Sequence, residues 1–334
     1  MREKVVFFDV LRCVAALAVV TIHVLGPYRE QLGVISDSAW STAIVLNSFS
    51  RWAVPIFIMI TGALMLSDTR PFAPGYYVRR RLGKVLIPFL IWSLFYAGLS
   101  GLSADGYDAG HAWETLKHMP EHETYYHLGF FYYFLPLYFV VPFLRYYVQQ
   151  ADRIGTLGLT VTWLAMTGLY LLSVDGLWSE QLLLYSGYLL LGYSLFVYRW
   201  PALPWLILPG IAALLLTAYM VISHSLAAGE YTVGRWLSYK TLNTAVIAAL
   251  VFALCRHWSE RMSARWLRGA AFVSRYSLGI YLLHPIFLWP VRAYDWYFAH
   301  PLIMIPFWTL IITALALGAS WLLARYRLTA WLVP

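Results

Sequence analysis

Three ionisable side chains lie within the first apolar run of the chain, at Asp9, Arg12 and His23. An ionised group near the centre of a bilayer costs about 2.5–3.5 kcal/mol, so such groups usually face a cavity or a partner. In an α-helix, the step of eleven positions from Arg12 to His23 corresponds to about three full turns and about 16 Å. Asp9 falls near the same face, at the i, i+3 spacing of an ion pair with Arg12. We predict one polar stripe along this helix, which could form either a functional path or an anchor to a neighbouring helix.

A second apolar run contains one cation, Arg51, within the segment SFSRWAVPIFIMITG. Pro55 is expected to kink this helix and free a carbonyl, while Thr61 and Gly62 permit close approach of another backbone. Arg51 could extend its charge to the membrane interface. Alternatively, its guanidinium could bind an anion or a carbonyl oxygen in the cavity that the first helix lines.

A dense basic cluster precedes the third apolar run, in YYVRRRLGKVLIP. Arg80, Arg81 and Lys84 have the i, i+1 and i+4 spacing of neighbours at the start of a helix. Guanidinium groups bind phosphate through paired hydrogen bonds, so the cluster could be a phosphate site. The simpler interpretation is attraction to anionic lipid headgroups on the cytoplasmic side.

The segment SRYSLGIYLLHPIF places Ser277, Tyr281 and His284 at separations of four and three residues. Such separations put the three side chains on one face of a helix. They could line a substrate cavity, or His284 could form an ordinary hydrogen bond between helices.

Three further histidines, His118, His122 and His127, lie close together in the sequence. Pro120 interrupts any helix that would join the first two, and the spacing does not match the H-E-x-x-H metal motif. We therefore expect no metal site, and interpret His127 as a polar residue at the mouth of a cavity.

The composition shows which elements must position these residues. Of the 334 residues, 61% are hydrophobic and only 12% are charged, against about 25% charged in soluble domains. This balance excludes a soluble globular enzyme, a disordered chain and a disulfide-framed secreted domain. Ten apolar runs can be marked, at about 5–25, 43–66, 83–103, 127–148, 154–173, 181–198, 202–223, 238–255, 272–291 and 302–324. We predict an all-α polytopic membrane protein of about ten helices, with residues 1–334 as a single domain.

The distribution of positive charge predicts the orientation of these helices. Most of the 24 Lys and Arg residues, Arg2, Lys4 and Arg199 among them, fall in segments on the same side as the N-terminus. The opposite side holds only Arg29, Lys117, Arg235, Lys240 and Arg292. Because cytoplasmic loops are rich in Lys and Arg, both termini are expected in the cytoplasm. The net charge of +8 thus reflects topology, and we expect no nucleic-acid partner. The N-terminal stretch lacks a small-residue cleavage site and is expected to remain as the first span.

Four motifs occur in order along the chain. Asp9 and Arg12 precede His23; Tyr77, Arg80, Arg81, Lys84 and Pro88 form the second motif; His127-Leu128-Gly129-Phe130 is the third; Ser274, Ser277, Gly279, Tyr281 and His284 form the fourth. Together they resemble the acyltransferase family 3 integral-membrane proteins over essentially the whole chain. Within that family, the chain looks most like the enterobacterial common antigen O-acetyltransferase branch. Thr61, Lys84 and the Gly129-Phe130 pair depart from the family pattern.

The resemblance implies a bacterial inner-membrane O-acetyltransferase that moves an acetyl group from cytosolic acetyl-CoA to a sugar hydroxyl of an extracytoplasmic glycan. Under this hypothesis, Arg80, Arg81 and Lys84 bind the CoA phosphates, and His23 removes the hydroxyl proton. Arg12 and Asp9 fix the stripe electrostatically, while Arg51 or Tyr281 stabilises the developing oxyanion. His127, Ser277 and His284 line the substrate cavity. Direct transfer and an acetyl-histidine intermediate at His23 are both open.

A transporter or flippase is the alternative of a different class. A polytopic bundle with buried Arg and His residues also fits a carrier. Carriers often show inverted repeats with paired broken helices, and the sequence shows no such internal symmetry. The two hypotheses differ in whether acetyl label is transferred to a glycan precursor.

Overall fold

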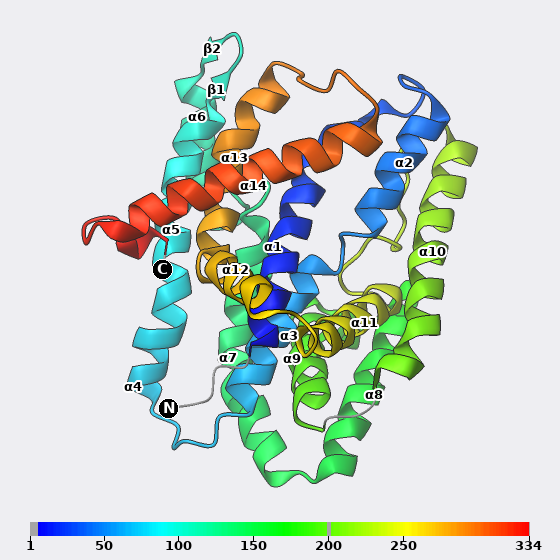
Figure 1. Ribbon diagram of the computed structural model, residues 1–334, viewed down its shortest axis with the longest axis vertical. Coiled ribbons are helices and arrows are strands. Elements are labelled where there is room, and N and C mark those ends of the chain that lie inside the picture. Colours follow the sequence, from blue (N-terminus) through cyan, green and yellow to red (C-terminus); the bar gives the residue numbers. More distant parts are fainter. Residues whose placement is uncertain (1–5, 199–201, 334) are drawn as a thin grey trace.

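Helices make up most of the described chain (Figure 1). The computed structural model describes residues 6–198 and 202–333. Arg2, Lys4 and Arg199 lie outside the described residues, as does the expected break at Trp200–Pro201. The long helices are α1 (Phe7–Val24), α2 (Asp37–Ser48), α3 (Ala53–Leu66), α5 (Gly83–Ser100), α7 (Gly129–Gln150), α8 (Arg153–Leu171), α9 (Gln181–Val197), α10 (Ala202–Ala228), α11 (Leu242–Ser259), α12 (Ala264–Arg275), α13 (Ser277–Ala293) and α14 (Pro301–Arg325).

Short elements connect these helices. They are the helical turns η1 (Gly26–Gln31), η2 (Val78–Leu82), η3 (Leu177–Ser179) and η4 (Ala330–Leu332), the helices α4 (Pro74–Tyr77) and α6 (Ala109–Lys117), and the strands β1 (Leu102–Ser103) and β2 (Gly106–Tyr107). The two strands pair antiparallel. The sequence explains several boundaries: for example, the Asp152 carboxylate accepts a hydrogen bond from the Gly155 amide at 2.7 Å and caps the start of α8.

The predicted all-α polytopic membrane fold is confirmed. Among the described residues, seven helical segments are long and apolar enough to cross a membrane, and eight if the bent pair α12–α13 is one span. Each of the ten apolar runs corresponds to a helix or a broken helix. Helix α9, with 17 residues, falls short in length. Helix α7 is rich in tyrosine and also carries Arg145 and Gln residues, and it is not among the seven.

Two of the expected helices are broken, and the breaks move residues of the predicted site. The second apolar run divides into α2 and α3, with Arg51 in the intervening turn. The prediction of a kink at Pro55 is wrong. Pro55 lies in the first turn of α3, where backbone amides form no hydrogen bond within the helix, so a proline there breaks none. The run expected at 272–291 also divides, since α12 and α13 meet at 68°. Ser274 therefore belongs to α12, whereas Ser277 begins α13.

Helix α1 lies in the interior of the bundle, in contact with α3, α11, α12, α13 and α14 (Figure 1). The long helix α14 crosses this group obliquely. Helix α3 packs closely on α9, because a Cβ added at Gly62 would lie 2.1 Å from the Leu189 carbonyl oxygen, and one at Gly192 would lie 2.1 Å from that of Met59. This confirms the expected close backbone approach at Gly62, and α3 also packs against α1.

Candidate active site

Two cavities lie along α1, one at each end of the predicted polar stripe. The Arg12 cavity has a volume of about 250 Å³, and the His23 cavity about 550 Å³. The Arg12 cavity is lined by Arg12, Phe57, Ile60, Thr61, Leu64, Met65, Arg81, Val85, Phe130, Phe131, Phe134, Tyr138, Ser277, Leu278 and Tyr281. The His23 cavity is lined by Val19, Ile22, His23, Gly26, Pro27, Arg29, Arg51, Val54, Tyr126, His127, Gly129, Phe130, Tyr133, Tyr239, Tyr281 and Arg292.

Phe130 and Tyr281 line both cavities and form their shared wall. Their ring centroids lie 5.8 Å apart in an edge-to-face arrangement. The Tyr281 hydroxyl donates a hydrogen bond to the His127 carbonyl, which fixes this ring against the start of α7. A molecule that reaches from Arg12 to His23 must therefore pass these two rings.

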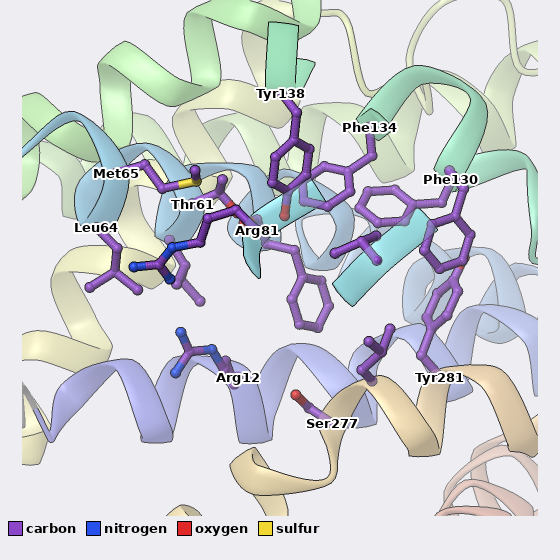
Figure 2. A pocket seen from close by; sticks show the side chains of 15 residues that line it. Arg12, Thr61, Leu64, Met65, Arg81, Phe130, Phe134, Tyr138, Ser277 and Tyr281 are labelled. Atoms are coloured by element: carbon purple, nitrogen blue, oxygen red, sulfur yellow. The ribbon is translucent and has the colours of Figure 1, made fainter. Parts of the chain in front are cut away.

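The Arg12 cavity combines a polar end with a narrow apolar interior. Figure 2 shows the Arg12 and Arg81 side chains extending into the same space, with Phe130, Phe134 and Tyr281 further along. An Nη of Arg12 lies 3.9 Å from Asp9 Oδ1, so the predicted ion pair is present. Ser274 Oγ donates to the same carboxylate at 2.7 Å. The Asp9 side chain is buried, and its ion pair with Arg12 restricts the position of the guanidinium group.

The basic cluster is divided by the local backbone. Residues 78–82 form one wide π-helical turn before α5, and only Arg81 of the predicted three residues lines the Arg12 cavity. Arg81 also lines a neighbouring cavity of about 220 Å³ that contains Arg70 and Arg145. Arg80 and Lys84 are exposed and line neither cavity. All three basic residues are exposed, and Arg81 alone of them lies at the edge of the cavities.

Three histidines from three segments meet at the far end of α1. The His23 ring stacks on His284 with centroids 5.1 Å apart, and His127 lies edge-on to His284 at 5.5 Å. His284 Nδ1 lies 2.7 Å from the Tyr281 carbonyl oxygen, so this nitrogen carries the proton and Nε2 holds a free lone pair. His284 Nε2 and both ring nitrogens of His127 are buried without a hydrogen-bond partner in the described chain. The histidine cluster therefore contains ring nitrogens that are available for a hydrogen bond with a molecule bound in the cavity.

Arg29, Arg51 and Arg292 bring three guanidinium groups to the His23 cavity. They come from η1, from the turn between α2 and α3, and from the end of α13. Burial, and next the like charge of Arg51, lower the pKa of the Arg29 guanidinium. The sequence suggested a cavity role for Arg51 but assigned Arg29 and Arg292 only to loops on one side of the membrane. Their position directly after a span end was the signal that could have identified them.

Among residues 6–198 and 202–333, no group of three or more His, Cys, Asp or Glu side chains is arranged to hold a metal ion. His118 is exposed, and its Nδ1 lies 3.6 Å from Glu121. His127 instead lines the His23 cavity, as the sequence suggested.

A family model described as an acyltransferase domain matches residues 5–325, nearly the whole chain. The chain belongs to the acyltransferase 3 family. No curated protein and no solved structure gave a match. Family membership, together with the apolar helices, makes the protein a multi-pass membrane acyltransferase that takes an acyl donor. In this acyltransferase, the two cavities along α1 adjoin at the wall formed by Phe130 and Tyr281.

Proposed function

We propose that the protein is an O-acetyltransferase that moves an acetyl group from acetyl-CoA to a hydroxyl of a cell-surface glycan or its lipid-linked precursor. This places it in the branch that the sequence resembles, the enterobacterial common antigen O-acetyltransferases. The observation that carries the proposal is the pair of cavities along α1, one with Arg12 and Arg81 and the other with the histidines. In this proposal the acyl donor binds in the Arg12 cavity and the acceptor in the His23 cavity, on opposite sides of the wall formed by Phe130 and Tyr281. This arrangement suits transfer of an acetyl group across the bilayer.

The Arg12 cavity fits the acyl donor. Arg81, with Arg80 and Lys84 exposed beside it, supplies guanidinium and ammonium groups for the CoA phosphates. The apolar interior between α3, α5 and α7 suits a thin, flexible arm that carries the thioester toward Phe130. We infer that this end faces the cytoplasm, with both termini, in a bacterial inner membrane, because basic residues gather there.

The His23 cavity fits the acceptor. Its volume lies within the range of small-molecule sites, about 300–1,000 Å³, and its wall combines aromatic rings with a few polar groups. His23 removes the proton of the acceptor hydroxyl as the hydroxyl oxygen attacks the thioester carbonyl carbon. The carbon–sulfur bond then breaks, and the proton passes to the departing thiolate. Arg51 stabilises the negative oxygen of the intermediate.

His284 and Tyr281 position His23 and do not themselves react. His284 stacks on His23 and holds its ring, and the hydrogen bond from His284 to the Tyr281 carbonyl fixes the tautomer of His284. Asp9 and Ser274 fix Arg12. His127 and Ser277 line the path on either side of the shared wall.

Replacement of His23 tests the proposal. The His23→Ala protein, reconstituted in vesicles with radiolabelled acetyl-CoA and glycan precursors, should lose transfer at least about a hundredfold, because a general base contributes about 10²–10⁴-fold. The matched control is His224→Ala, since His224 is exposed on α10 and lines neither cavity. Full transfer by a folded His23→Ala protein would refute the assignment. Movement of labelled precursor without acetylation would favour a carrier instead.

A further inference from the structure

We propose that the His23 cavity binds an anionic group of the acceptor, a carboxylate or a phosphate, next to the hydroxyl that is acylated. This proposal rests on the proposed function, because it takes the His23 cavity as the acceptor site. It adds a substrate class, namely acceptors that carry their own negative charge. The evidence is a set of three arginines that face the cavity without any acidic partner.

The partners of the three guanidinium groups are all uncharged: they are oxygen atoms and, for Arg51 and Arg292, the rings of Tyr239 and Tyr126. Arg29 donates to the Ile22 carbonyl at 3.0 Å and to Asn47 Oδ1 at 3.5 Å, Arg51 donates to the Tyr239 hydroxyl at 2.9 Å, and Arg292 donates to the His23 carbonyl. The Nε atom of each arginine is buried and has no hydrogen-bond partner in the described chain. Buried N–H groups of a charged side chain normally donate a hydrogen bond, so these three Nε–H groups lack an acceptor.

No carboxylate of the described residues compensates these charges. All residues that line the cavity lie in the described part of the chain, and none of them is acidic. Within 6–198 and 202–333, Arg29, Arg51 and Arg292 form no ion pair. The acids nearest in sequence, Glu30 and Asp295, are exposed and do not line the cavity. Because buried charges are usually paired, a bound anion is the missing partner.

The reaction itself does not account for three positive charges. The oxyanion of acyl transfer carries one negative charge and exists only briefly. Arg51 can serve it and still leave Arg29 and Arg292 for a permanent anion. The fold also makes room for Arg292, because a Cβ added at Gly26 would lie 2.8 Å from its Nη2. Guanidinium forks pair with carboxylate and phosphate through two hydrogen bonds, which gives the chemical class of the ligand.

Binding of simple probes tests the site apart from catalysis. Glucuronate and glucose 1-phosphate should raise the melting temperature of the full-length protein in detergent, whereas glucose should not. The two anionic probes distinguish a carboxylate on the sugar from a phosphate of the carrier. Added salt should weaken both effects. If neither anion binds better than glucose, the proposal is wrong.

Variants of the arginines test which of these residues bind the anion. Arg29→Gln and Arg292→Gln should each weaken anion binding about tenfold, since a hydrogen bond to a charged group is lost. Arg29→Lys should retain part of the binding, because it keeps the charge without the fork. Lys117→Gln is the control, since it removes one charge from the exposed helix α6. Acetyl-CoA binding should be unchanged in every variant, which also shows that each variant is folded.

Transfer assays separate this proposal from the proposed function. The wild-type protein should acetylate a glucuronoside or glucose 1-phosphate with a kcat/KM at least about tenfold above that for glucose, and Arg29→Gln should remove the difference. Equal use of neutral and anionic acceptors would overturn the anion site while leaving the acetyltransferase intact. Anion binding without any use of acetyl-CoA would overturn the proposed function and leave the anion site.

Discussion

At the scale of single residues, neighbouring cations in one motif have different surroundings. Arg80 and Arg81 are both exposed, but only Arg81 lines the Arg12 cavity and the neighbouring cavity that contains Arg70. Arg80 and Arg81 are adjacent in the helical turn at 78–82, and adjacent residues of a helix point in different directions, so the two side chains do not share a face. Arg12 depends on a partner instead, because the buried Asp9 and Ser274 orient it.

Removal of Arg81 should weaken the donor specifically. We expect Arg81→Gln to reduce acetyl-CoA affinity about tenfold or more, because Arg81 lines the Arg12 cavity and a charge-assisted hydrogen bond to phosphate is lost. Arg80→Gln removes the same charge from a residue that lines neither cavity and should therefore have a smaller effect. Calorimetric titration with acetyl-CoA measures both variants. Equal losses would show that the cluster acts only through its total charge.

At the scale of elements, the contact of α3 with α9 sets the position of the helix that carries Thr61 and Met65. Gly62 and Gly192 allow the two backbones to touch, and each faces a carbonyl oxygen of the other helix. Without a hydrophobic driving force between helices in lipid, such close contacts are the main source of association. A side chain at either position must push the helices apart and deform the Arg12 cavity.

Two glycine variants compare a tight site with an open one. Gly192→Ala should lower the melting temperature in detergent, because its Cβ would lie 2.1 Å from the Met59 carbonyl oxygen and overpacking costs about 1–3 kcal/mol. Gly158→Ala on α8 has open space around its Cβ and should be neutral or stabilising, since alanine favours a helix over glycine by about 0.5–1 kcal/mol. A stable Gly192→Ala protein would contradict the close packing of α3 and α9.

At the scale of the whole molecule, three cavities follow one another through the bundle. The cavity at Arg70 shares Met65 and Arg81 with the Arg12 cavity, and the Arg12 cavity shares Phe130 and Tyr281 with the His23 cavity. The Arg12 and His23 cavities are both lined by residues of α1, which lies in the interior of the bundle (Figure 1). A donor and an acceptor that enter from opposite ends would meet at the two shared rings.

A larger ring at this wall should separate binding from transfer. We expect Phe130→Trp to keep acetyl-CoA affinity close to the wild-type value and to lower kcat for transfer at least about tenfold, because a small displacement of the reacting group reduces the rate strongly. Phe139→Trp is the control, since Phe139 lies on the same helix and is 66% exposed. Parallel measurements of donor binding and label transfer decide the question. A Phe130→Trp protein with unchanged kcat would exclude passage at this wall.

The sequence by itself predicted the all-α membrane fold and the stripe on α1. Apolar runs of span length must satisfy their own backbone hydrogen bonds, so helices follow from composition. The spacing of Asp9 and Arg12 and the shared face of Ser277 and Tyr281 are properties of one helix, and both can be read from helical periodicity. The sequence did not predict the break at Arg51, because the presence of Pro55 led us to expect a kink there instead.

Tertiary structure alone brought Arg29 and Arg292 to His23, and left Arg80 and Lys84 outside the cavities. Arg29 follows α1 and Arg292 ends α13, so their meeting depends on how these helices pack. No period within a single helix contains that information, because contacts between helices depend on packing at small residues such as Gly26. The sequence therefore determined which groups lie within the membrane, and the packing of the helices decided which of them share a cavity.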